Sequence, residues 1–153
     1  MTKGGKLLLA GVEVAEGISP IAHSDGDVVL HAVVDALLGA AGLGDIGEMF
    51  PNTDPQWKGA ASRVFVESAM REVRQRGWGP VNADITILAD KPKLKPYKSK
   101  MADVVSKLLD CPVNIKAGTN EGCDAVGRGE AIAAHAVVLL ARRGEPETGK
   151  IKP

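Results

Sequence analysis

The chain has 153 residues, 19 basic and 19 acidic side chains and three histidines, so its formal net charge is zero. A neutral chain with 3% aromatic residues has neither the basic field nor the stacking surface that nucleic-acid binding requires. The apolar run Leu7–Leu9 is far too short to cross a bilayer, and the two cysteines form no metal-binding pattern. We therefore expect one cytoplasmic domain over residues 1–153, with reduced thiols and no nucleic-acid or membrane partner.

The first part of the chain predicts a hairpin followed by a helix. Leu7–Leu9 and Val12–Val14 flank Ala10-Gly11, a pattern typical of two short antiparallel strands. Apolar residues at helical spacing predict a helix over Val28–Ala40, and Asp25 is the residue that we expect to cap it.

The rest of the chain alternates between helices and strands. Prolines, polar residues and a glycine over Phe50–Ala61 predict a mobile loop. The further predicted elements are a helix capped by Ser62 that runs to Arg76, a strand over Ala83–Ala89, a helix over Tyr97–Leu109, a strand over Val113–Ala117, an alanine-rich helix over Glu130–Arg143 and a polar tail from Gly144. This order predicts an α/β fold, an α+β two-layer sandwich with helices on one face of a small mixed sheet.

Three titratable residues, Asp27, His31 and Asp35, recur at intervals of four on the first predicted helix. Residues four apart lie on one face of a helix, and the other positions of this helix are mostly apolar. Burying such a stripe is costly unless each group has a partner, and a metal ion or a bound phosphate would be one. The alternative is a histidine at the edge of the core that is satisfied by Asp27 or Asp35, because one histidine is not a metal site.

Residues 22–55, AHSDGDVVLHAVVDALLGAAGLGDIGEMFPNTDP, resemble the signature of the 2-C-methyl-D-erythritol 2,4-cyclodiphosphate synthase family. The segments DITILADKPKLKP, VNIKAGTNE and VGRGEAIAAHAVVLL follow in the family's order, so the resemblance covers roughly Lys6 to Arg142. It implies a homotrimer around a central axis with active sites between subunits, and an axial cavity suited to prenyl diphosphates. It also implies that 4-diphosphocytidyl-2-C-methyl-D-erythritol 2-phosphate is converted to the 2,4-cyclodiphosphate and CMP.

The resemblance makes His31 a zinc ligand, and it places two further ligands in an Asp-x-His motif at the end of a strand before Lys6. The printed sequence begins Met1-Thr2-Lys3-Gly4-Gly5 and contains no Asp-x-His, so the Zn²⁺ site is incomplete in this chain. Two expectations follow. Either the first strand lies upstream of Met1, which the downstream motifs favour, or the chain is a diverged homologue without a complete zinc site.

His23 and Ser24 precede the first predicted helix, where backbone N–H groups favour anions. Turn and capping chemistry alone would also explain them. The resemblance makes His23 a catalytic residue that stabilises the transition state, and it makes Ser24 a substrate contact.

The segments Asp45-Ile46-Gly47 and Phe50–Asp54 are, by composition, ordinary turn sequences. The resemblance implies that they hold the methylerythritol hydroxyls and form a loop over the substrate. The substrate-binding residues are then Asp45, Gly47, Phe50, Asn52 and Asp54. An ionised Asp45 carboxylate is a suitable acceptor for a diol.

Two later segments carry the nucleotide-binding residues that the resemblance implies. They are Ala89, Pro92, Lys93, Lys95, Gly118 and Thr119. The first segment is basic and would otherwise be interpreted as a solvated surface, but backbone groups there can read the edge of cytosine. Gly118 replaces the first of two family threonines, which removes one hydroxyl from the site.

The loop after the strand predicted over Val113–Ala117 contains three more residues of interest. By resemblance Thr119 is a second catalytic contact, Glu121 holds Mg²⁺ or Mn²⁺ with the diphosphate, and Arg128 contacts a substrate phosphate. A single carboxylate suffices for Mg²⁺, which binds through one or two carboxylates and phosphates. An inter-subunit ion pair of Arg128 with Glu130 or a neighbour is the alternative, and the two roles are compatible.

Two residues of catalytic type receive no role. Cys123 has no recognisable base beside it and reads as a structural thiol, and His135 is expected to pack within the last predicted helix. A cyclodiphosphate synthase needs no enzyme nucleophile, because the 2-phosphate of the substrate attacks the β-phosphorus and CMP leaves. The alternatives to the enzyme are a silent trimeric homologue that binds phosphate or isoprenoid-diphosphate ligands and a general phosphate-binding module.

Overall fold

The computed structural model describes residues 1–144, so the predicted polar tail lies outside the described residues except for Gly144. Strands β1 (Thr2–Leu9) and β2 (Val12–Ser19) pair antiparallel through a turn at Ala10-Gly11. Both turn residues have positive φ, 53° and 72°, as the tightest hairpin turns require. The predicted hairpin is therefore confirmed, and both strands extend beyond the predicted apolar residues.

A second sheet of three strands has the order β4-β3-β5. The central strand β3 (Trp78–Leu88) pairs parallel with β4 (Val113–Gly118) and antiparallel with β5 (Ala133–Arg142). The sheet is thus small and mixed, as the sequence predicted.

The prediction of a final helix over Glu130–Arg143 is wrong, because β5 occupies this segment. Ala134, Ala136 and Val138 point toward the core, while Val137 and Leu139 are 72% and 55% exposed. Apolar side chains on both faces hide the period of two that marks a strand, and the alanines suggested a helix. Pairing with the whole length of β3 overrides that local preference. His135 consequently lies exposed on a strand and not in a helix.

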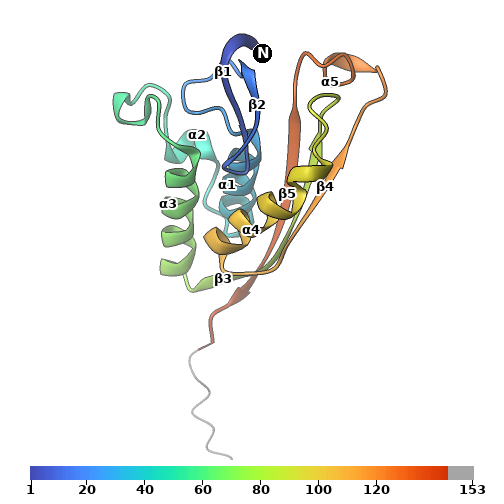
Figure 1. Ribbon diagram of the computed structural model, residues 1–153. Coiled ribbons are helices and arrows are strands. Elements are labelled where there is room, and N and C mark those ends of the chain that lie inside the picture. The colour runs from blue at the N-terminus through green and yellow to red at the C-terminus, as the bar shows by residue number, and fades with distance from the viewer. Residues whose placement is uncertain (145–153) are drawn as a thin grey trace, which may run out of the picture.

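Helices α1 (Val28–Ala40), α3 (Ser62–Gln75) and α4 (Lys98–Leu109) cover one face of the three-stranded sheet (Figure 1). Helix α1 packs against β5 and α3, and α4 packs against β4. Short helical turns occupy the connections: α2 (Ile46–Met49), η1 (Pro55–Trp57), η2 (Lys95–Tyr97) and α5 (Asp124–Gly127). The predicted two-layer sandwich with helices on one face is confirmed.

The core lies between these two layers. Helix α1 contributes its buried face, which consists of Val29, Leu30, Val33, Val34, Leu37 and Leu38. The central strand contributes Ala83, Ile85 and Ile87 from the opposite side. Among the described residues, no helix has both the length and the apolar character needed to span a membrane.

Candidate active site

The loop that carries His23 and Ser24 is fastened to the start of α3. The Gly59 N–H donates to the His23 carbonyl at 2.9 Å, and the Asp25 N–H donates to the Ala60 carbonyl at 3.2 Å. One Asp25 carboxylate oxygen accepts from the Ser62 N–H at 2.8 Å, while the other faces the Ser62 hydroxyl. Residues far apart in the sequence are thereby fixed side by side.

Both capping predictions were wrong. Asp25 binds the first N–H of α3, whereas Asp27 is the N-cap of α1 and accepts from the Val29 and Leu30 N–H groups. Ser62 is the first residue of α3 and not its cap, and its hydroxyl faces Asp25. Asp25 therefore binds the start of a helix 37 residues away in the sequence. Local capping signals do not reveal such a distant partner.

Asp27 is fully buried and joins the hairpin to α1. Besides the two amides of α1, its carboxylate accepts from the N–H groups of Ala10 and Gly11 at 2.9 and 2.6 Å. Burial raises the pKa of this carboxyl, and the hydrogen bonds from Gly11, Leu30 and Ala10 oppose that rise. The expectation that a metal or phosphate satisfies this group was wrong, because backbone amides of the protein do so.

His31 also has partners other than the predicted ones. Its Nε2 lies 2.8 Å from the Ser62 hydroxyl and 3.2 Å from the Ser24 hydroxyl. Asp35 instead accepts from the Ile46 N–H at 2.8 Å and so holds the start of α2. The predicted stripe is real as a face of α1, but each of its three members binds a different neighbouring segment.

The described residues do not provide a zinc site around His31. Within residues 1–144, no group of three or more histidine, cysteine or acidic side chains is close enough to hold a metal ion. Zinc in proteins takes at least three protein ligands, and the Nε2 atom of His31 already faces two hydroxyls.

The predicted substrate loop is built from turns around an aromatic anchor. Asp45 caps α2, where its carboxylate accepts from the Glu48 N–H at 2.8 Å. Phe50 is 8% exposed, and its ring centroid lies 4.6 Å from that of Phe65 and 5.1 Å from that of Trp57. The buried Phe50 side chain therefore anchors the loop to the rings of Trp57 and Phe65.

The remaining members of this set lie at the surface of the same loop. Gly47 and Asn52 are exposed, and Asp54 caps the short turn η1 by accepting from the Gln56 N–H at 3.0 Å. Their polar groups are accessible to a ligand above the loop.

All six predicted nucleotide-binding residues line one pocket of about 330 Å³. It lies between the segment after β3 and the end of β4, and its walls also include Leu94, Lys98 and Ala117. Sequence reasoning missed these three, although Lys98 continues the basic segment that contains Lys93. The lining combines three lysines and the Thr119 hydroxyl with small and apolar residues, a composition suited to a base attached to phosphates.

The loop beyond the pocket carries Thr119, Glu121 and Arg128. The Thr119 hydroxyl accepts from the Glu121 N–H at 3.1 Å and lies 3.4 Å from an Asp90 carboxylate oxygen. Glu121 is exposed in a left-handed conformation with φ of 50°. Arg128 forms an ion pair with Glu130 of its own chain, and not between subunits as expected, through contacts of 2.9 and 3.0 Å. The charged side chains of Glu121 and Arg128 are both exposed to solvent.

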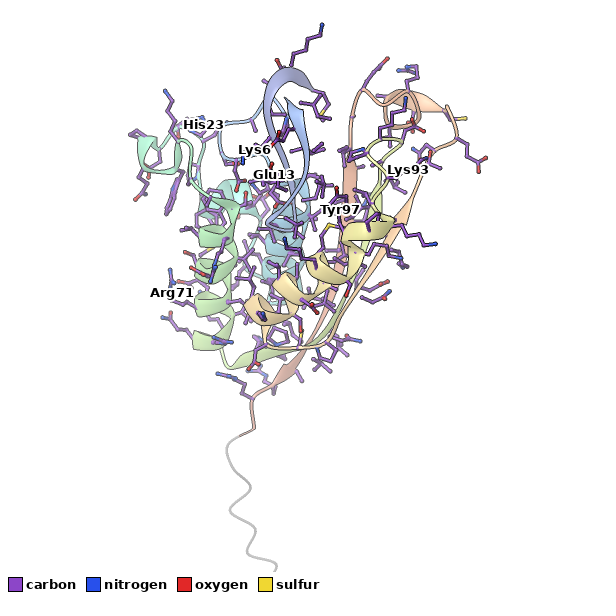
Figure 2. All side chains as sticks on the ribbon, viewed as in Figure 1. Lys6, Glu13, His23, Arg71, Lys93 and Tyr97 are labelled. Atoms are coloured by element: carbon purple, nitrogen blue, oxygen red, sulfur yellow. The ribbon has the colours of Figure 1, made fainter. Side chains whose placement is uncertain are left out.

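The candidate residues around His23 and those around the pocket at Lys93 do not meet within one chain. Figure 2 shows His23 on the side of the molecule formed by α2 and α3, and Lys93 on the opposite side beyond the hairpin and α4. A ligand that touches both groups would therefore need more than one copy of the chain, or a second surface.

Comparison with known proteins identifies the family. The sequence model of the YgbB family matches residues 1–141. The 2-C-methyl-D-erythritol 2,4-cyclodiphosphate synthase of Bordetella pertussis is 53% identical over 147 residues, which are 94% of this chain and 91% of that protein. The chain belongs to the YgbB family of 2-C-methyl-D-erythritol 2,4-cyclodiphosphate synthases. The resemblance noted in the sequence is thereby confirmed.

Solved structures of the YgbB family share the fold. A CDP-bound 2C-methyl-D-erythritol-2,4-cyclodiphosphate synthase is 41% identical, with a TM-score of 0.83 over 92% of this chain and 93% of that one. The bifunctional IspDF from Campylobacter jejuni is 42% identical with a TM-score of 0.88 over 92% of this chain, which spans 39% of that longer protein. Relatives that carry the synthase name along nearly the whole chain favour the enzyme over the silent homologue.

Proposed function

We propose that this chain converts 4-diphosphocytidyl-2-C-methyl-D-erythritol 2-phosphate to 2-C-methyl-D-erythritol 2,4-cyclodiphosphate and CMP. The observation that carries this proposal is the single pocket that gathers all six residues expected to bind the nucleotide. A solved relative of the same fold is described as bound to CDP, which supports a cytidine diphosphate ligand here. The one-domain organisation and the cytoplasmic location stay predictions, and the single apolar core of the described residues supports the former.

The proposed mechanism consists of positioning and charge neutralisation. An oxygen of the 2-phosphate attacks the β-phosphorus, the bond from that phosphorus to the CMP oxygen breaks, and CMP leaves with the electron pair. His23 and Ser24 donate to the phosphate oxygens on one side, and Thr119 donates on the nucleotide side. Arg128 is expected to add a charge-assisted contact, with Glu130 keeping its guanidinium oriented between catalytic cycles.

Glu121 is the residue that we propose for a divalent cation. Its carboxylate is exposed on the loop beside the pocket, and a single carboxylate with substrate phosphates is a usual way of binding Mg²⁺ or Mn²⁺. When bound there, such an ion would neutralise charge on the diphosphate. Zinc does not fit the described residues of one chain, since His31 is one ligand only, and we assign no step to it.

A homotrimer with sites between subunits is the assembly that we propose. The distance between His23 and Lys93 in one chain supports sites shared by two copies (Figure 2). The outward face of β5 supports a contact between copies, since Val137 and Leu139 are 72% and 55% exposed there. A prenyl diphosphate along the trimer axis, against this apolar face, remains a finer prediction of the same assembly.

The first test is an assay of CMP release from the diphosphocytidyl substrate with Mg²⁺ and Zn²⁺ supplied. The proposal expects CMP and the cyclic diphosphate in equal amounts, and His23→Gln should lower kcat by about 10²–10³. Thr119→Val should lower kcat, whereas Thr2→Val on the exposed strand β1 should not. CDP binding without any turnover would overturn the enzyme and support the silent homologue.

The assembly is tested by replacing one side chain on the open sheet face. Val137→Asp should shift the sedimentation coefficient from that of a trimer to that of a monomer and abolish CMP release. Val81→Asp is the matched control, because Val81 is also exposed but lies on β3. A monomeric, active wild-type chain would overturn the shared site.

A further inference from the structure

The hydroxyl of Ser62 is fully buried between the Asp25 carboxylate and Nε2 of His31. A serine hydroxyl has one proton to donate, and an ionised carboxylate only accepts. Asp25 is surrounded by donors, since it also accepts from the N–H groups of Ser62 at 2.8 Å and Asp27 at 3.1 Å. The single proton of Ser62 is therefore committed to Asp25.

The ring nitrogen that faces Ser62 must then carry the hydrogen. With its proton directed at Asp25, the Ser62 oxygen offers a lone pair to His31 Nε2 at 2.8 Å. An unprotonated Nε2 would set two lone pairs against each other in a buried site, which is unfavourable. A neutral imidazole has one N–H, so Nδ1 retains a free lone pair. Within residues 1–144, no hydrogen bond to Nδ1 of His31 is found.

The same assignment decides what Ser24 can do. Its oxygen accepts from the Gly26 N–H at 3.2 Å and lies 3.2 Å from Nε2 of His31. Because Nε2 is a donor, it needs no proton from Ser24. The Ser24 hydroxyl is then left with a proton that it can donate to a ligand above the loop.

We propose that Asp25 and Ser62 are positioning residues that hold His31 in the Nε2–H tautomer, which presents the Nδ1 lone pair and frees the Ser24 hydroxyl to donate to phosphate. The backbone bonds at Gly59 and Ala60 fix the same two segments, so the arrangement is preorganised before substrate binds. The tautomer stands on the geometry alone, whereas its effect on turnover rests on the proposed function.

The direct test is the tautomer of His31 in the wild-type chain. Long-range ¹H–¹⁵N spectra of histidine-labelled protein, recorded at mildly alkaline pH, distinguish the two ring nitrogens. The chain has three histidines, and His23→Gln, His31→Gln and His135→Gln assign them. We expect a pyrrole-like Nε2 and a pyridine-like Nδ1 for His31. The opposite assignment, or an equal mixture, overturns the proposal.

Two substitutions then test the role of Ser62. Ser62→Ala should convert His31 to a mixture of tautomers, and Ser62→Thr, which keeps the hydroxyl, should restore the Nε2–H form. Ser68→Ala is the matched control, because Ser68 lies on the same helix and accepts from Arg71 instead. An unchanged tautomer in folded Ser62→Ala would overturn the role of Ser62, and the wild-type spectrum remains decisive if that variant does not fold.

Kinetics separate this inference from the proposed function. In a chain that releases CMP, Ser62→Ala should lower kcat about 10- to 100-fold with little change in KM, the range typical of residues that orient a functional histidine. A chain with the expected tautomer but no CMP release would retain the positioning role and overturn the synthase. Full activity in a Ser62→Ala variant with mixed tautomers would overturn the link between the tautomer and turnover.

Discussion

The junction between the hairpin and α1 differs in construction from the candidate nucleotide pocket. At the junction, Asp27 is buried and four backbone amides satisfy it. At the pocket, Lys93 and Lys95 are exposed, and within residues 1–144 no ion pair is found for either. The difference teaches that polar groups of the first region hold the fold, whereas those of the second region are left available for a ligand. Substitutions in the two regions should therefore affect different measurements.

The largest effect is expected for Asp27→Ala. It would leave four amide donors without an acceptor in a buried site and should lower the free energy of unfolding by about 3–5 kcal/mol. Chemical denaturation measures this change. Asp103→Ala on the exposed side of α4 is the control and should stay within about 0.5 kcal/mol.

Asp27→Asn sharpens the same test. The side-chain NH₂ group would face a backbone N–H at one of the two oxygen positions, so asparagine should restore only part of the stability. Full recovery would show that the accepting geometry matters less than the shape of the side chain, and it would weaken the contrast between the regions.

A substitution at Gly127, in the loop beside the pocket, should lower stability as substitutions at the hairpin–α1 junction do. A Cβ atom at Gly127 would lie 2.7 Å from the carbonyl carbon of Gly122 and 2.9 Å from its nitrogen, so the loop that carries Glu121 and Arg128 must shift. Gly127→Ala should destabilise this loop by about 1–3 kcal/mol. Hydrogen exchange should speed up at the Gly127 and Arg128 amides and remain slow in α1.

The control for this substitution is Gly39→Ala, because no atom outside its own helix lies within 4 Å of the added methyl group. Unchanged hydrogen exchange in Gly127→Ala would mean that the loop accommodates the added methyl group without strain. Glu121 and Arg128 would then be held less rigidly than the contacts indicate.

Sequence reasoning predicted the elements that show a clear hydrophobic periodicity. It missed the strand that depends on pairing with another strand. The bounds of α1 follow from its apolar spacing, and the prediction Val28–Ala40 is confirmed. The last strand was missed because Val137 and Leu139 are apolar on the open face, so no alternation of polar and apolar residues was visible. Only the pairing with β3 decides that segment.

The candidate site shows the same division. The residues that the resemblance predicts to bind the nucleotide line one pocket, because each short motif stays together in the fold. Local capping rules failed for Asp25 and Ser62, since their bond joins segments 37 residues apart. The roles of Asp27 and Asp35 were also hidden, because their partners are backbone amides of other elements that a sequence does not place nearby.

The pocket itself is tested by Lys93→Ala. Losing one charge-assisted contact to a phosphate should weaken CDP binding about tenfold, or ~1.4 kcal/mol, as measured by calorimetry. Stability should change by less than about 0.5 kcal/mol, because the side chain is exposed. Lys100→Ala, an exposed lysine of α4 outside the pocket lining, should leave CDP binding unchanged. A large loss of stability in Lys93→Ala would contradict the contrast between the two regions.

The smallest effect is expected for a surface pair on the open face of the sheet. The Lys116 ammonium lies 2.6 Å from an Asp84 carboxylate oxygen, and its hydrogen bond, together with that of Asn114, lowers the pKa of Asp84. A lowered pKa contributes stability above the ordinary carboxyl pKa of 3.8, and this contribution is lost as pH falls through the folded-state value.

Lys116→Met should therefore raise the pKa of Asp84 toward its ordinary value, which an NMR titration of the carboxyl group measures. Lys116→Arg should keep the pKa low, and added salt should weaken the effect in the wild type, because the pair is exposed to solvent. If neither the substitution nor added salt changes the pKa of Asp84, then Asn114, or burial by a second copy of the chain on this face, sets that pKa instead.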